Sequence, residues 1–225
     1  MSAKSMAELS PAILTNDVSD FRKKYAELFA LSHLFTKLHV DFADGDFVAN
    51  KTIMPHDLNF MKSSPLTLMA HFMTYKPQRY FWDAKKAGFT WVLVHFEAPD
   101  DAAELEHVID HAKSMHFQVG LVVNPETRLH SLGKFVQKVD MIQLMGIHPG
   151  AQGREFIHET YPRVRELRAL RKNVIIAVDG GVKVGIAHNL AKDGADILVA
   201  GSAITQAHDY KAAIEALKMD IELNN

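Results

Sequence analysis

The 225-residue chain contains no cysteine. Without thiols it can form neither disulfides nor thiolate–metal bonds, so a metal site would have to use His, Asp or Glu. Its apolar runs are also too short for a membrane helix, which needs ~20 residues. The first residues, MSAKSMAELS, lack the apolar core of a signal peptide. We therefore expect a cytoplasmic protein that neither spans nor binds a membrane.

An excess of charge of either sign is missing as well. The formal net charge is -2 and the sequence pI is about 6.7, which leaves no general basic surface for nucleic acid or anionic lipid. Hydrophobic residues make up 48% and charged residues 23% of the chain, which is typical of a globular protein. No linker or change of composition divides it, so we expect one domain spanning residues 1–225.

Apolar and amphipathic segments alternate along the chain. Continuous apolar runs, typical of buried parallel strands, occupy residues 12–15, 36–42, 66–73, 91–98, 118–124, 141–147, 174–181 and 197–204. Helical periodicity is found at residues 19–32, 101–116, 154–172 and 183–194, and residues 217–225 are expected to be a frayed tail. Eight strand–helix units predict an α/β fold, a single (β/α)8 TIM barrel. A doubly wound open sheet is the alternative, but its G-x-G-x-x-G fingerprint after the first strand is absent.

In such a barrel, function is located at the carboxyl ends of the strands. His39, Asp41, His71 and Asp179 lie at three of these ends. His39 and Asp41 alternate with apolar Leu38 and Val40, so they share one face of their strand. Any one of them could be an ordinary hydrogen-bonded residue. Together, two imidazoles and two carboxylates favour one divalent ion such as Zn, Fe, Mn or Co, because a cation also offsets the repulsion between the acids.

Glycines follow the last three predicted strands. They occur in HPGAQGREF (148–156), DGG (179–181) and AGSAI (200–204). Glycine lets backbone N–H groups approach a ligand, and barrels commonly hold a phosphate in the loops after strands seven and eight. A phosphorylated substrate is therefore predicted, although Gly180, Gly181 and Gly201 taken singly are also compatible with simple turns.

Seven segments of the chain occur in an order that resembles the ribulose-phosphate 3-epimerase family. They are PAILTND, HVDFADGDFVAN, MAHFM, VGLVVNPET, HPGAQG, VDGGV and AGSAI. The resemblance implies a (β/α)8 barrel with one divalent metal that interconverts D-ribulose 5-phosphate and D-xylulose 5-phosphate. It also implies a homo-oligomer.

The resemblance also implies roles for individual residues. His39, Asp41, His71 and Asp179 would be the metal ligands, with Asp41 and Asp179 doubling as the acid/base pair. Gly150, Gly153, Gly180, Gly181, Gly201 and Ser202 would line the phosphate and sugar, and Met73 and Met145 would form an apolar cover. Inversion beside a ketone removes a proton from one face and returns one to the other through an enediolate, which explains two acids and a Lewis-acidic ion. The family assigns Asp41 as the base for ribulose 5-phosphate.

Three positions depart from the family pattern. Ala12 stands where a sugar-contacting Ser is usual, and Ala43 stands where the cover usually has a further Met. The phosphate loop reads GAQGR, which would bring Gln152 and Arg154 to the mouth of the barrel, with Arg154 either binding phosphate or solvated. Two alanines predict a larger pocket, so a six-carbon ketose phosphate is an alternative substrate.

Two other classes of protein deserve comparison. Decarboxylases of related fold carry an Asp-x-Lys-x-x-Asp motif on the third strand, whereas this strand reads MAHFM. A non-catalytic sugar-phosphate-binding relative would need the same glycines. Retention of both acids argues against it, because two carboxylates do not favour binding an anion.

Overall fold

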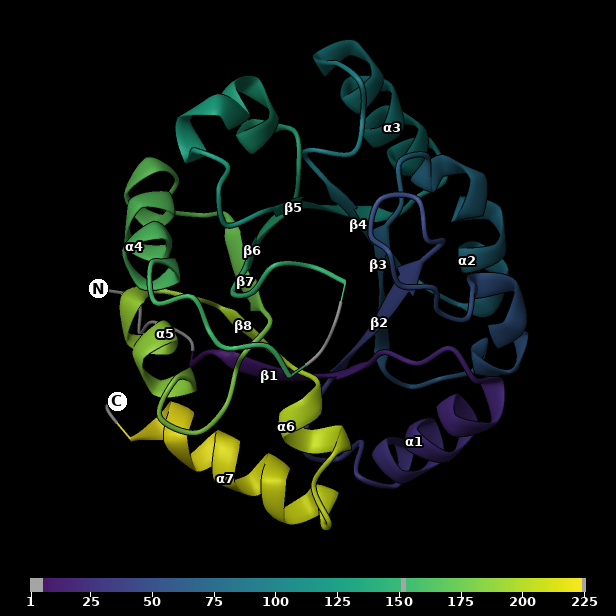
Figure 1. Ribbon diagram of the computed structural model, residues 1–225, viewed down its shortest axis with the longest axis vertical. Helices are drawn as coiled ribbons and strands as arrows, with labels where there is room; N and C mark the ends of the chain where they lie inside the picture. The colour runs from purple at the N-terminus through teal and green to yellow at the C-terminus, as the bar shows by residue number, and fades with distance from the viewer. Residues whose placement is uncertain (1–5, 151–152, 224–225) are drawn as a thin grey trace.

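The computed structural model describes residues 6–150 and 153–223. Parallel strands form a closed barrel in the order β1-β2-β3-β4-β5-β6-β7-β8, and the helices surround it (Figure 1). The strands are β1 (Glu8–Ile13), β2 (Lys37–Ala43), β3 (Thr67–Met73), β4 (Trp91–His95), β5 (Gln118–Val123), β6 (Met141–Met145), β7 (Ile175–Asp179) and β8 (Ile197–Ala200). Because β1 pairs with β8, the sheet has no open edge. The predicted TIM barrel is confirmed, and the doubly wound alternative is wrong.

The strands are connected by α-helices and short 3-10 helices. The α-helices are α1 (Val18–Ala30), α2 (Phe81–Ala87), α3 (Ala102–Ser114), α4 (Thr160–Leu170), α5 (Ala187–Asp193), α6 (Ser202–Thr205) and α7 (Tyr210–Glu222); the 3-10 helices are η1 (Pro55–Met61), η2 (Pro77–Tyr80) and η3 (Leu129–Gln137). Asp17 and Asp101 begin α1 and α3 by accepting hydrogen bonds from backbone N–H groups of the first turn. None of the helices in the described residues is long and apolar enough to cross a membrane.

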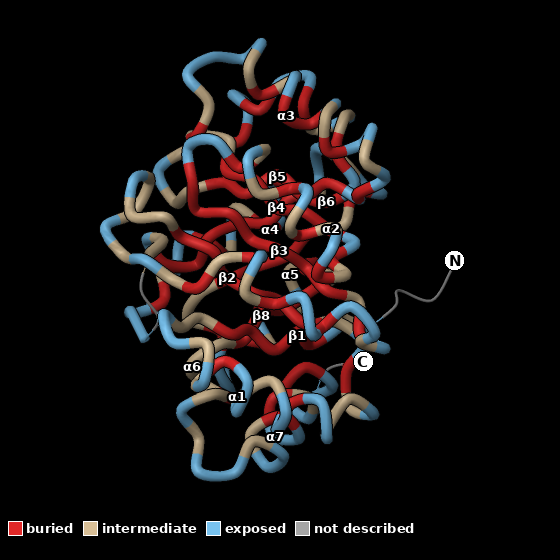
Figure 2. Tube along the Cα trace, turned by 90° about the vertical axis from the view of Figure 1, so that its right-hand side faces the viewer, coloured by how far each residue is buried: buried red, intermediate tan, exposed pale blue. Residues whose placement is uncertain are grey.

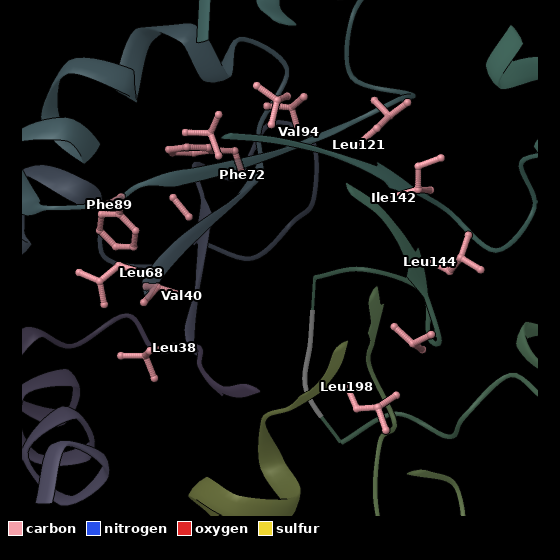
Figure 3. Close-up of a cluster of buried hydrophobic side chains, with 14 of the residues drawn as sticks. Leu38, Val40, Leu68, Phe72, Phe89, Val94, Leu121, Ile142, Leu144 and Leu198 are labelled. Atoms are coloured by element: carbon pink, nitrogen blue, oxygen red, sulfur yellow. The ribbon is translucent and has the colours of Figure 1, made fainter. Parts of the chain in front are cut away.

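Side chains alternate between two apolar layers. Leu38, Val40 and Phe42 of β2 point outward into the core between barrel and helices, where Figure 3 shows Leu38 and Val40 beside Leu68 of the neighbouring strand β3. Figure 2 shows this burial as red strands enclosed by partly exposed helices. The opposite faces of the strands fill the barrel interior with residues such as Met69, Leu93 and Met141. His39 and Asp41 share that inner face, as their alternation predicts.

Some predicted boundaries differ from those observed. Strand β1 begins at Glu8 rather than residue 12, and α4 begins only at Thr160. The prediction of a frayed tail at residues 217–225 is wrong for its described part, because α7 continues to Glu222 with Leu217 and Ile221 buried. Residues 224 and 225 lie outside the described part of the chain.

Candidate metal centre and active-site cleft

Neighbouring strands bring the predicted ligands together. Asp41 and His71 are directly paired in the register of β2 and β3, and His39 lies two residues earlier on the same face. Asp179 is the last residue of β7. The parallel barrel thus collects side chains that are far apart in sequence at one end, as predicted from the strand-end rule.

Four side-chain atoms converge at this point. Oδ1 of Asp41 lies 3.1 Å from Nε2 of His39 and 2.8 Å from Nδ1 of His71. Oδ2 of Asp179 lies 3.5 Å from the same nitrogen of His39 and 3.4 Å from that of His71. Each imidazole therefore faces both carboxylates.

The cluster is nearly sealed from solvent. His39 and His71 are fully buried, and Asp41 and Asp179 are only 6% and 8% exposed. Burial acts to raise the pKa of Asp41, but the charges and hydrogen bonds of His39 and His71 hold that pKa well below its usual value. Burial likewise acts to lower the pKa of His71, yet its hydrogen bonds to Asp179 and Asp41 raise it to about 9. A positive charge at this position is thus strongly favoured.

The donor set fits a divalent ion. One ligand atom from each of the four residues lies within 4.8 Å of every other. Nitrogen and oxygen ligands that bind one ion at ~2.0–2.2 Å are themselves ~3–3.5 Å apart, which agrees with the four contacts above. A cation among them would also replace the proton of His71 as the counter-charge to the two acids.

A cleft of about 470 Å³ opens directly above the cluster. Its lining includes Asp41, His71, Asp179, Met73, Met145, Gly150, Gly153, Gly180, Gly181, Gly201 and Ser202. The structure therefore places every glycine singled out in the sequence, together with both methionines, around one space. Their roles toward a sugar phosphate stay predictions. Leu14, Ile147, Pro149 and Val182 also line the cleft and were not predicted.

Gly180 illustrates why the cleft needs glycine. Its φ is +100°, and a Cβ there would lie 2.3 Å from Cγ1 of Ile147. Neighbouring Gly181 has a φ of +72°, and its Cβ would lie 2.8 Å from that of Phe156. Both positions thus exclude larger residues for reasons of backbone and packing, in addition to any ligand.

The departures from the family pattern have different outcomes. Ala12 lines the cleft, whereas Ala43 is 1% exposed and is absent from its lining, so only Ala12 widens it. Arg154 is exposed and does not line the cleft either, so the prediction that it reaches the mouth is not supported. Gln152 lies outside the described residues.

Two further polar residues, Gln143 and His95, contact the cluster without having been predicted, and a third, Glu97, contacts His95. Nε2 of Gln143, inside β6, donates to Oδ2 of Asp179 over 3.0 Å. His95, the last residue of β4, places its Nε2 2.9 Å from Nε2 of His71, and Glu97 lies behind it. The only signal in the sequence was a polar residue inside or at the end of an apolar run, as in MIQLM and WVLVHFEA.

Comparison with known proteins agrees with this architecture. A family model described as the ribulose-phosphate 3 epimerase family matches residues 8–205. Ribulose-phosphate 3-epimerase of Bacillus subtilis is 32% identical over 222 residues, covering 96% of this chain and 97% of that protein. The chloroplastic ribulose-5-phosphate-3-epimerase of Arabidopsis thaliana is 33% identical over 223 residues, covering 96% of this chain and 78% of that protein.

Among solved structures, 3-hexulose-6-phosphate synthase superposes with a TM-score of 0.72 at 19% identity, covering 95% of this chain and 99% of that one. This likeness concerns the fold alone. The family match, by contrast, covers residues 8–205 of this chain, a range that contains all four residues of the buried cluster. The chain therefore belongs to the ribulose-phosphate 3-epimerase family.

Proposed function

We propose that this chain is a metal-dependent epimerase that inverts C3 of a ketose phosphate, interconverting D-ribulose 5-phosphate and D-xylulose 5-phosphate. The observation that carries the proposal is the presence of two carboxylates, Asp41 and Asp179, in one buried cluster at the base of the cleft. They come from β2 and β7, which are not neighbours in the barrel. Two separate acids are what a proton exchange between two faces of a carbon needs.

The metal would be held by His39, Asp41, His71 and Asp179. When bound, a divalent ion supplies Lewis-acid stabilisation of the negative charge that develops on the substrate oxygen. The choice of nitrogen and oxygen ligands is compatible with Zn, Fe, Mn or Co.

Proton transfer is the work of the two aspartates. Asp41 is held ionised by its histidine neighbours, so it is ready to accept the C3 proton of ribulose 5-phosphate. Loss of that proton gives the enediolate, and Asp179, which enters this step as the carboxylic acid, then supplies its proton to the opposite face of C3. After the product leaves, Asp41 releases its proton to solvent and Asp179 takes one up. Gln143 donates to one oxygen of Asp179, which restricts how that carboxylate turns. In the reverse direction the two acids exchange roles.

The rest of the cleft suits a sugar phosphate. Met73 and Met145 offer apolar surface beside the acids, which would exclude water from a carbon that carries negative charge. The glycine-containing loops after β6, β7 and β8 lie around the same space and would receive the phosphate.

One observation favours a second candidate substrate. Ala12 lines the cleft and offers no hydroxyl to a pentulose, so an epimerase of another ketose phosphate, such as a hexulose 6-phosphate, is the alternative. A non-catalytic sugar-phosphate-binding protein is a weaker alternative, because it would have no use for buried Asp41 and Asp179.

The test is a screen of the purified, metal-loaded full chain against pentulose 5-phosphates and hexulose 6-phosphates. Formation of the C3 epimer is followed by NMR. Conversion of ribulose 5-phosphate supports the proposal, conversion of a hexulose alone supports the alternative substrate, and binding without conversion of any ketose contradicts an epimerase. We further propose a homo-oligomer, as the resemblance implies, and a cytoplasmic location, as expected from the sequence; native mass and cell fractionation test these two points.

A further inference from the structure

His95 lies directly behind the cluster, on the side away from the carboxylates. Its Nε2 is 2.9 Å from Nε2 of His71, and the two rings stack with centroids 5.1 Å apart. His95 is fully buried, and the ring of Phe47 covers it at 4.7 Å between centroids. His95 is absent from the lining of the cleft, so it contacts His71 without reaching a substrate.

Two imidazole nitrogens at hydrogen-bond distance need one proton between them. The other nitrogen of His71, Nδ1, faces Asp41 and Asp179, and a metal ligand must present an unprotonated nitrogen to the ion. A neutral His71 that binds metal through Nδ1 therefore carries its proton on Nε2 and donates it to His95. Nε2 of His95 must accept, so the proton of that ring sits on Nδ1.

Glu97 is placed to receive this second proton. Its Oε2 lies 3.5 Å from Nδ1 of His95, and neither atom makes a hydrogen bond within the described parts of the chain, so each is a buried polar atom that faces the other. Its other oxygen, Oε1, accepts from the backbone N–H of Asn124 over 2.9 Å and from the hydroxyl of Thr127. A carboxylate anchored at one oxygen thus turns the other toward His95.

We propose that Glu97 and His95 are positioning residues that fix the tautomer of His71, so that its Nδ1 is presented to the metal. The inference rests on the metal centre of the proposed function. In this relay, Nε2 of His71 donates to Nε2 of His95, and Nδ1 of His95 donates toward Oε2 of Glu97. The direction is the same with and without metal, because a doubly protonated His71 also donates from Nε2. A ligand pre-oriented by such outer contacts binds metal more tightly than one free to turn.

Glu97→Gln tests the direction in which the hydrogen bonds of the relay are donated. The N–H of Asn124 can only donate, so the amide oxygen of Gln must face it, and the amide NH2 must then face His95. Nδ1 of His95 would then have to accept a hydrogen bond from this amide, so the ring proton of His95 would move to Nε2. The N–H groups of His95 and His71 would point at each other, and their hydrogen bond would be lost. We expect affinity for Co²⁺ or Zn²⁺, measured by competition with a chelator, to fall tenfold to hundredfold. Glu126→Gln, the same change at an exposed acid, is the matched control and should alter affinity less than twofold.

His95 is tested by a pair of variants that separate hydrogen bonding from packing. His95→Gln retains a side-chain oxygen that can accept from His71, and should bind metal within about threefold of the parent. His95→Leu fills similar space without an acceptor and should lose at least tenfold. Equal losses in the two variants, or no loss in Glu97→Gln, would overturn the proposal.

The parent protein supplies a readout that needs neither metal nor activity. Long-range proton–nitrogen NMR of the metal-free chain should show His95 with a protonated Nδ1 and a bare Nε2; the opposite tautomer contradicts the relay even if a variant fails to fold. A parent that holds this tautomer but epimerises no ketose phosphate would refute the proposed function alone. A parent that epimerises while Glu97→Gln binds metal normally would refute the relay alone.

Discussion

The carboxylate of Asp41 and the imidazole of His71 sit side by side on β2 and β3, with Oδ1 2.8 Å from Nδ1. Each would lose its shortest contact in the buried cluster without the other, so removing either side chain would alter metal binding, the protonation of the cluster and the stability of the fold together. The predictions below separate these effects.

His71→Ala should lose metal and activity together, since it removes one ligand of four. Metal per chain is measured by elemental analysis beside the epimerisation rate. His56→Ala, at an exposed histidine outside the cluster, is the control and should retain both. Full metal occupancy in the His71→Ala variant would show that the ligand assignment is wrong.

Stability of the metal-free protein should fall as the solution becomes alkaline. The pKa of His71 is raised from 6.5 to about 9. Protonated His71 therefore contributes fully to the free energy of unfolding below pH 6.5, and this contribution is lost as the pH rises through 9. A shift of this size corresponds to ~3 kcal/mol. Urea unfolding of the metal-free parent and of His71→Gln should give free energies of unfolding that differ most at pH 6 and converge by pH 10.

Metal affinity should rise over the same pH range, because the ion displaces the proton of His71. An affinity that does not change with pH would contradict this account.

Ala12→Ser should raise kcat/KM for ribulose 5-phosphate by up to roughly tenfold, because a hydrogen bond to the sugar contributes about 0.5–1.5 kcal/mol. Ala12→Cys adds similar volume with a weaker donor and should give little gain. Ala43→Met should give no gain, since that site is buried and overpacking costs about 1–3 kcal/mol. No gain from Ala12→Ser, or a gain on a hexulose instead, would rule out Ala12 as the obstacle to pentulose turnover.

Asp41→Asn and Asp179→Asn should each block epimerisation, because an amide neither accepts the proton nor supplies one at neutral pH. Product formed by the parent in heavy water should carry deuterium at C3 from the first turnover, since the delivering acid exchanges with solvent. Metal content must be measured in both variants, because each also loses a ligand. First-turnover product that keeps its original hydrogen would exclude two opposed acids.

Gly180→Ala should destabilise the barrel by about 2–4 kcal/mol, combining strain at positive φ with a clash against Ile147. Gly185→Ala has a φ of +84° but no atom within 4 Å of the new Cβ, so only the strain remains and the loss should be about 1–2 kcal/mol. Equal losses in urea unfolding would show that packing against Ile147 does not constrain this loop.

The barrel and the convergence of the four buried cluster residues could be predicted because strand alternation and strand ends leave a pattern in the sequence. His39 and Asp41 interrupt an apolar run on one face only, which is visible without a structure. Gln143 and His95 interrupt their runs once each, and their meaning depends on contacts with Asp179 and His71 from other strands. No local pattern encodes such contacts.

The C-terminal helix was missed for a related reason. Residues 217–225 carry mixed polar and apolar residues and no cap of their own. In the structure Lys218 donates to the backbone oxygen of Leu34, and Asp220 accepts from the backbone N–H groups of Gly185 and His188. These long-range hydrogen bonds, together with buried Leu217, order a segment whose local propensity is weak.

Closure of the barrel through β1 and β8 has a consequence for biosynthesis. Residues Glu8–Pro11 pair with Ile197–Ala200 of β8, so this edge of the first strand stays unpaired until β8 has left the ribosome. His39, Asp41 and His71 emerge early on adjacent strands, whereas Asp179 arrives with β7. The four residues of the buried cluster are therefore all present only once β7 has been made, so an ion held by all four of them would bind late in folding.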